Sequence, residues 1–292
     1  MYTRRKLPEL DVRPAGWFST ILLFAVPAFI FILLFHRVGP AMRTMGVSWW
    51  LVFHVVLIVP LAAMLTAALV AATREDRSIA GVKRRLRLHK PDLAGWIWAG
   101  ALSGFMFGGN TADLLAIALA FAALYIEKTR SPWGYGAIIL AVLLKQNAEE
   151  FRPALQSVAI FEPAGFYRDF FDHFGPADFM GVPLQGAWWV LIYYAFLILV
   201  FNIGGEELWW RGYVLPRQEA AFGNTAWMIH GVMWSLFHLF MQPTPWETVR
   251  MTITSLALAY VVQRTANTWA GIAGHAAGNL PFFLSLVHGV RG

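Results

Sequence analysis

Long apolar runs recur along the whole of this sequence, and they constrain its fold more than any other feature. Residues 15–35 form the first run and residues 48–72 the second, and a helix needs about 20 apolar residues to cross a bilayer. Charged residues make up only 14% of the 292 positions, whereas soluble domains carry about 25%. The pattern indicates an integral membrane protein. Because no small-residue cleavage site follows the first run, we predict a retained helix rather than a signal peptide.

The remaining apolar runs are mostly shorter than the first two. They lie near residues 94–108, 112–126, 134–145, 186–203, 224–242, 249–263 and 267–288. We predict an all-α fold, a polytopic transmembrane helical bundle of about eight spans, because helices satisfy their own backbone hydrogen bonds in lipid. The run at 134–145 fits a tilted, a re-entrant or an interfacial helix equally well. The predicted location is the cell membrane, as a multi-pass protein surrounded by lipid.

Charge divides the chain into three predicted regions. Residues 1–145 hold the N-terminal transmembrane helices, residues 146–185 a polar acidic connection, and residues 186–288 a second transmembrane core. The basic loop at 73–93 belongs on the cytoplasmic side by the positive-inside rule. We therefore assign the net charge of +6 to topology and lipid headgroups, and predict no nucleic-acid partner. The absence of cysteine excludes disulfides, thiol nucleophiles and thiolate metal sites.

Two polar features lie outside the last third. The stretch FYRDFFDHF places Asp169, Asp172 and His173 at helical spacing. An amphipathic helix on the membrane interface is the favoured interpretation, and metal binding the alternative. His54 lies within the second apolar run together with Pro60. We predict that His54 is a packed histidine bonded to a neighbour, and that Pro60 kinks its helix.

The first of three polar motifs follows the run at 186–203 and reads GGEELWWRGYVLP. Ionisable residues inside membrane helices are costly and usually functional. Glu207 and Arg211 are four apart, so on a continuous helix they would share a face and form an internal salt bridge. Glu206 would be turned about 100° away and could serve as a general base in a low-dielectric cavity. The alternative is a helix end at the interface, with Gly204 and Gly205 marking a kink or break.

The second motif, WSLFHLF, places His238 deep in an apolar helix, with Trp234 one turn before it. A histidine in such a helix is either a catalytic group or a packed side chain. His230 lies two turns before His238 and competes with it for any catalytic role.

The third motif, GHAAGNLP, places His275 and Asn279 on one helix face. Both side chains can donate hydrogen bonds. Gly274 and Gly278 have the small-xxx-small spacing that lets membrane helices approach closely. Pro281 cannot donate a backbone hydrogen bond and should loosen the helix beside Asn279. A polar clamp between helices is the alternative to a catalytic role.

Together the three motifs contain the parts needed for hydrolysis. Glu206 and His238 could hold and deprotonate a water, and His275 with Asn279 could stabilise the oxyanion. The HExxH zinc motif is absent from the sequence. We predict no cofactor and no metal. Metal-assisted hydrolysis, with Glu206, His238 and His275 as ligands, stays open as a variant.

These motifs resemble those of the CPBP intramembrane proteases, the CAAX protease and bacteriocin-processing family, which includes Rce1-like prenyl-protein endopeptidases. The resemblance covers about residues 186–285. The matching residues are Glu206, Glu207 and Arg211 for EExxxR, Trp234 and His238 for FxxxH, and His275 and Asn279 for HxxxN. The departure is Trp234, which stands where phenylalanine is usual.

The resemblance implies a glutamic intramembrane protease, without an obligatory metal, that cleaves near the cytoplasmic face. It assigns water activation to Glu206 and His238, and the oxyanion site to His275 and Asn279. Glu207 and Arg211 would support this arrangement as an internal ion pair. The substrate would be a membrane-associated peptide or protein, of the CAAX type or another type. The alternatives are a non-catalytic membrane protein, such as an immunity factor or scaffold, and a transporter with a proton-relay carboxylate.

Overall fold

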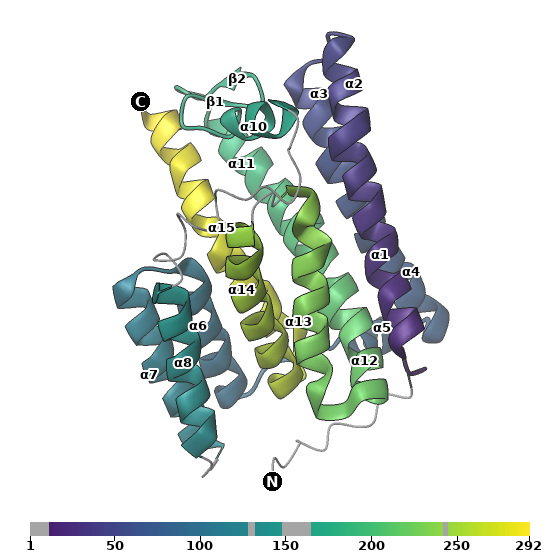
Figure 1. Ribbon diagram of the computed structural model, residues 1–292, viewed down its shortest axis with the longest axis vertical. Helices are drawn as coiled ribbons and strands as arrows, with labels where there is room; N and C mark the ends of the chain where they lie inside the picture. Colours follow the sequence, from purple (N-terminus) through teal and green to yellow (C-terminus); the bar gives the residue numbers. More distant parts are fainter. Residues whose placement is uncertain (1–11, 128–131, 148–164, 242–244) are drawn as a thin grey trace.

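The computed structural model describes residues 12–127, 132–147, 165–241 and 245–292. Over these residues the chain is a bundle of helices with one short β-hairpin (Figure 1). This confirms the predicted all-α class. The basic residues 1–11, and much of the predicted acidic connection at 148–164, lie outside the described residues.

The helices follow the order of the predicted apolar runs. They are α1 (Trp17–Leu33), α2 (Gly39–Thr44), α3 (Trp49–Phe53), α4 (Val59–Glu75), α5 (Ile79–Arg85), α6 (Leu93–Phe107), α7 (Asn110–Ile126), α8 (Pro132–Asn147), α10 (Gly165–Asp172), α11 (Trp188–Leu197), α12 (Leu215–Phe222), α13 (Ala226–Phe237), α14 (Pro245–Thr265) and α15 (Thr268–Arg291). Wider π-helical turns continue several of them, namely η1 (Leu34–Val38), η2 (His54–Ile58), η4 (Ile198–Gly204) and η5 (Glu207–Val214). The hairpin pairs β1 (Asp178–Phe179) with β2 (Val182–Pro183).

Four helical runs among the described residues are long and apolar enough to cross a membrane. They are Trp17–Thr44, Trp49–Glu75, Trp188–Phe237 and Thr268–Arg291. The third reverses direction at Gly223, whose φ of +61° lets α13 return beside α12 (Figure 1). Helix α6 has 15 residues, which rise about 22 Å against a hydrocarbon core of about 30 Å. The count of about eight spans therefore stays a prediction.

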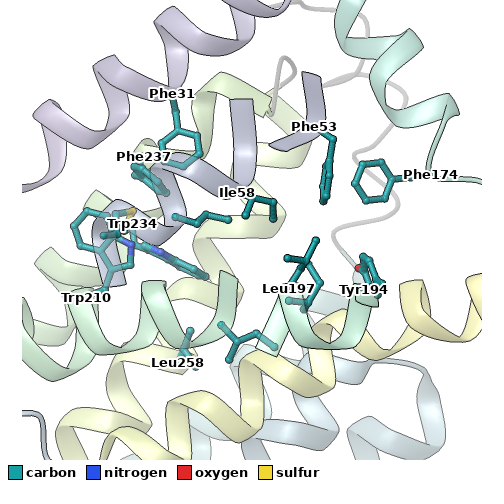
Figure 2. Close-up of a cluster of buried hydrophobic side chains, with 14 of the residues drawn as sticks. Phe31, Phe53, Ile58, Phe174, Tyr194, Leu197, Trp210, Trp234, Phe237 and Leu258 are labelled. Atoms are coloured by element: carbon teal, nitrogen blue, oxygen red, sulfur yellow. The ribbon is translucent and has the colours of Figure 1, made fainter. Parts of the chain in front are cut away.

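Aromatic side chains fill much of the space between the helices (Figure 2). Phe24 stacks on Trp210 with ring centroids 4.3 Å apart, and Trp210 meets Phe237 edge to face at 5.1 Å. Membrane helices gain little from leaving lipid for one another, so close van der Waals packing must hold them together. Rigid rings supply a large contact area for that purpose.

Two glycines of α15 allow close contact with α6. A Cβ atom placed on Gly274 would lie 2.5 Å from the side chain of Leu102, and one on Gly278 would lie 3.2 Å from Met106 Cε. The predicted small-residue contact is confirmed at these two positions. Helix α15 continues through Pro281, so this proline does not end it.

The prediction for His54 is confirmed, and so is the amphipathic helix predicted for the α10 segment, whose place on the membrane interface stays a prediction. His54 bonds through Nδ1 to the carbonyl of Trp50 at 2.6 Å and through Nε2 to the hydroxyl of Tyr193. Pro60 follows directly on the π-helical turn η2, which is where its helix departs from regular α geometry. Helix α10 is amphipathic, with buried phenylalanines and exposed aspartates.

Candidate active site

The first motif lies within an unbroken helical run, well away from its ends. Gly205 has helical backbone angles, φ −60° and ψ −50°, so the predicted alternative of a break at the glycines is wrong. A Cβ atom on Gly205 would lie 2.7 Å from the carbonyl oxygen of Leu61. This glycine therefore allows close contact with α4. Glu206 and Glu207 are 3% and 0% exposed, which also rules out a helix end that reaches into solvent.

Glu207 and Arg211 form the predicted internal salt bridge. Arg211 Nη1 donates to Glu207 Oε1 at 3.0 Å, and both side chains are fully buried. The guanidinium also lies over the ring of Trp234, 3.8 Å from its centroid. Room for the carboxylate comes from α15, because a Cβ atom on Gly271 would lie 2.4 Å from Glu207 Oε2. The pair is thus enclosed by three separate helical segments.

The carboxylate of Glu206 receives a hydrogen bond at each oxygen. Trp234 Nε1 donates to Oε2 and Asn202 Nδ2 donates to Oε1, both at 2.9 Å. His238 Nε2 lies 3.7 Å from Oε2. Nδ1 of the same ring bonds to the carbonyl of Trp234 at 2.8 Å. Because that nitrogen must carry the hydrogen, a neutral His238 has its lone pair on Nε2, on the side of Glu206.

The third motif is joined to the first through Glu207. His275 Nδ1 bonds to Glu207 Oε1 at 2.9 Å, the oxygen that also accepts from Arg211. Asn279 Nδ2 donates to the carbonyl of His275 at 3.1 Å, and the second N–H of that amide is a further donor. The three motifs therefore form one connected polar group.

All four predicted catalytic residues line a single cavity of about 260 Å³. They are Glu206, His238, His275 and Asn279, and Asn202 lines the same cavity. The rest of the wall is mostly apolar and includes Phe31, Phe174, Tyr194 and Phe237, which Figure 2 shows among the buried side chains. Such a cavity can exclude bulk water while keeping a few polar groups in fixed positions.

His230 is not part of this lining. It is fully buried and bonds through Nδ1 to Gln218 Oε1 at 2.6 Å. His238 was predicted deep within a helix, but it lies at the C-terminal cap of α13, where a 3₁₀ turn begins. Of the two competing histidines, the structure places only His238 beside Glu206. His173, for which the sequence left metal binding open as an alternative, bonds through Nδ1 to Asp178 Oδ2 at 2.9 Å.

The sequence did not reveal that Asn202 and Trp234 donate hydrogen bonds to Glu206. Asn202 is the one amide in the run AWWVLIYYAFLILVFNI, four residues before Glu206. That spacing and isolation could have identified it. The position of Trp234 one turn before His238 could have suggested that its indole N–H takes part in the site. The sequence gives no sign of which group accepts that hydrogen bond.

Among the described residues, no group of three or more His, Asp or Glu side chains is arranged to hold a metal ion. His275 directs Nδ1 to Glu207, so its Nε2 is the ring nitrogen on offer to the cavity. In this tautomer a neutral ring offers a lone pair at Nε2, and a protonated ring offers an N–H there.

Comparison with known proteins agrees with the motifs. Residues 187–281 match the Rce1-like family model, described as type II CAAX prenyl endopeptidase Rce1-like. No curated protein and no solved structure matches. The match confirms the resemblance to CAAX proteases over the part of the chain that carries all three motifs. It supports an integral membrane protein of the protease class, a hydrolase that acts on peptide bonds.

Proposed function

Proceeding from the Rce1-like region at residues 187–281, we propose that this protein is a multi-pass endopeptidase of the cell membrane. It hydrolyses a peptide bond in a membrane-associated peptide, of the CAAX type or another type, with Glu206 and His238 activating the water. One observation carries the proposal: Glu206, His238, His275 and Asn279 come from distant parts of the sequence and line the same cavity.

The first step is deprotonation of the attacking water. Glu206 Oε2 and His238 Nε2 are 3.7 Å apart, so a water beside both can donate one hydrogen to each acceptor. As the water oxygen bonds to the scissile carbonyl carbon, one proton passes to Glu206. A general base held in place in this way contributes about 10²–10⁴-fold to the rate.

The second requirement is stabilisation of the oxyanion. Asn279 has an N–H beyond the one that it donates to the carbonyl of His275. His275 can donate through Nε2 when it is protonated, because Glu207 accepts from its Nδ1. Losing one such donor costs about 10²–10³-fold in kcat in well-studied hydrolases.

The last step breaks the peptide bond and restores the enzyme. The tetrahedral intermediate collapses, the C–N bond breaks, and the proton held by Glu206 passes to the leaving amine. The products are a carboxylic acid, which then loses its proton to the solvent, and an amine. One water is consumed and no nucleophilic side chain is needed.

Glu207 and Arg211 support the site by fixing the position of His275. Glu207 Oε1 accepts from His275 Nδ1 and from Arg211 Nη1. A buried carboxylate without such partners would be costly. The ion pair therefore holds the His275 ring in place beside the cavity.

The test compares membrane proteomes of cells that express the wild type or Glu206→Ala. Cells with the variant should accumulate an uncleaved membrane-associated peptide or protein, identified by its shifted terminus. If the protein is a non-catalytic scaffold or immunity factor, the variant changes partner binding or folding and no terminus shifts. Cleavage by the purified wild type in the presence of a chelator would support direct attack by water. Loss of cleavage in the chelator would support the metal-assisted mechanism.

A further inference from the structure

The carboxylate of Glu206 is held by two side chains that take no direct part in the proposed chemistry. Asn202 Nδ2 and Trp234 Nε1 each donate to one oxygen at 2.9 Å. A carboxylate in an apolar cavity loses hydrogen bonds to water, and leaving it unpaired is costly. Both donors therefore stabilise the ionised form and restrict rotation of the carboxylate plane.

Trp234 links Glu206 to His238. Its indole N–H bonds to Glu206 Oε2, and its own carbonyl accepts from His238 Nδ1 at 2.8 Å. Its ring meets the His238 ring edge to face, with centroids 4.6 Å apart. One residue thus sets the position of both groups that face the attacking water. A phenylalanine here, as the FxxxH motif has it, would keep the carbonyl contact and lose the indole donor.

Asn202 fixes the other oxygen from the same helical run. It lies in the π-helical turn η4 and lines the cavity. Its bond to Oε1 leaves Oε2 as the oxygen nearest His238. Residues four apart share a helix face, so the amide lies on the same side as Glu206, and π-helical turns are frequent at functional sites.

We propose that Asn202 and Trp234 are positioning residues, a two-sided clamp that fixes the carboxylate of Glu206 against His238 for water activation. This inference rests on the proposed function. It adds to it two side chains to which the family resemblance assigns no chemical role. The clamp acts through Glu206, so its loss should affect turnover and the pH dependence of turnover more than substrate binding.

The test measures cleavage of a CAAX-type prenylated peptide by purified Trp234→Phe and Asn202→Leu. Each variant loses one hydrogen bond to a charged group, which should lower kcat about 10- to 100-fold. KM should stay within about twofold, because uniform substrate binding is untouched. The acid limb of the pH–rate profile should move to higher pH, since a carboxylate that has lost a donor is protonated more readily.

Trp210→Phe is the matched control. Trp210 is also a fully buried tryptophan, but its ring packs on Phe24 and Phe237 and its indole nitrogen has no partner among the described residues. The control should lose stability with its pH–rate profile unchanged. If Trp234→Phe fails to fold, 3-benzothienylalanine at position 234 removes the N–H and keeps the ring shape.

The results separate the clamp from the proposed function. Wild-type kcat and an unmoved acid limb in both the Trp234 and Asn202 variants would overturn the clamp, provided Glu206→Gln is inactive. An active Glu206→Gln protein would instead overturn the proposed function. A pH shift equal to that of the Trp210 control would mean that Trp234 acts by packing alone, which also contradicts the clamp.

Discussion

Arg211 shows how a membrane-embedded charge can be accommodated by its surroundings. The guanidinium is fully buried, donates to Glu207 and lies over the ring of Trp234. Removing one partner from a buried pair leaves the other charge uncompensated. Replacing Arg211 alone should therefore destabilise the protein more than replacing Arg211 and Glu207 together.

We expect Arg211→Met to lower the free energy of unfolding by about 3–5 kcal/mol. The double variant Glu207→Gln/Arg211→Met should recover part of that loss, because no lone charge remains. Thermal unfolding in detergent measures both. Equal loss in the single and double variants would show that the ion pair is not the source of the effect. The double variant should also be inactive, since His275 loses the carboxylate of Glu207 as its partner.

His230, in α13, and His238, at the C-terminal cap of α13, provide a second matched pair. His238→Gln should reduce cleavage about 10²-fold or more, because the water beside Glu206 loses the imidazole Nε2 that accepts one of its hydrogens. His230→Gln should keep its turnover per folded molecule, since His230 is outside the cavity lining and bonds to Gln218. Equal losses of kcat in the two folded variants would remove His238 from the mechanism.

At the scale of elements, the contact between α15 and the π-helical turn η5 sets the position of Glu207. Gly271 is the contact point, because a Cβ atom would lie 2.4 Å from Glu207 Oε2 and 3.0 Å from Val262 Cγ2. Glu207 Oε2 is the end of a side chain, but Arg211 and His275 hold its carboxylate through Oε1. The side chain of Glu207 would have to move, and His275 with it.

Gly271→Ala should therefore destabilise the protein by about 1–3 kcal/mol and reduce kcat. Gly278→Ala on the same helix is the control, because its nearest neighbour is the flexible Met106 Cε at 3.2 Å. Thermal unfolding and peptide cleavage measure the two effects. A Gly271→Ala protein as stable and active as the Gly278→Ala protein would contradict the assigned contact.

The elements also show what the sequence could and could not predict. Apolar runs located the long helices because lipid permits few alternatives. The pairing of Glu207 with Arg211 followed from their spacing. The close approach of Gly205 to Leu61 was not predictable, because it joins positions far apart in the sequence, and the pattern of apolar residues did not reveal the π-helical turns. The bond from Trp234 to Glu206 joins positions 28 apart in sequence, and only tertiary structure reveals it.

At the scale of the whole molecule, charge is distributed unevenly along the bundle. Helix α5 and the basic residues around it lie toward one end, and α10 with the β-hairpin lies at the other (Figure 1). The cavity wall includes Phe171 and Phe174, from the segment at the α10 end. The orientation of the bundle in the membrane therefore decides from which side a substrate reaches the site. It also decides whether cleavage takes place near the cytoplasmic face, as expected.

Because the chain contains no cysteine, single cysteines can report the orientation directly. Ala80, in α5, and Ala177, beside the hairpin, are both exposed. The positive-inside rule predicts that an impermeant maleimide labels Ala177→Cys in intact cells and Ala80→Cys only after permeabilisation. The reverse pattern would place the basic end outside and contradict the predicted topology.

The account depends most on the carboxylate of Glu206 as the base that activates water. The most direct measurement is the cleavage rate of a CAAX-type peptide by purified wild type and Glu206→Gln in the same detergent, with both shown to be folded. We predict cleavage by the wild type and a loss of about 10²-fold or more in the variant. A folded Glu206→Gln protein that cleaves at the wild-type rate would contradict the account.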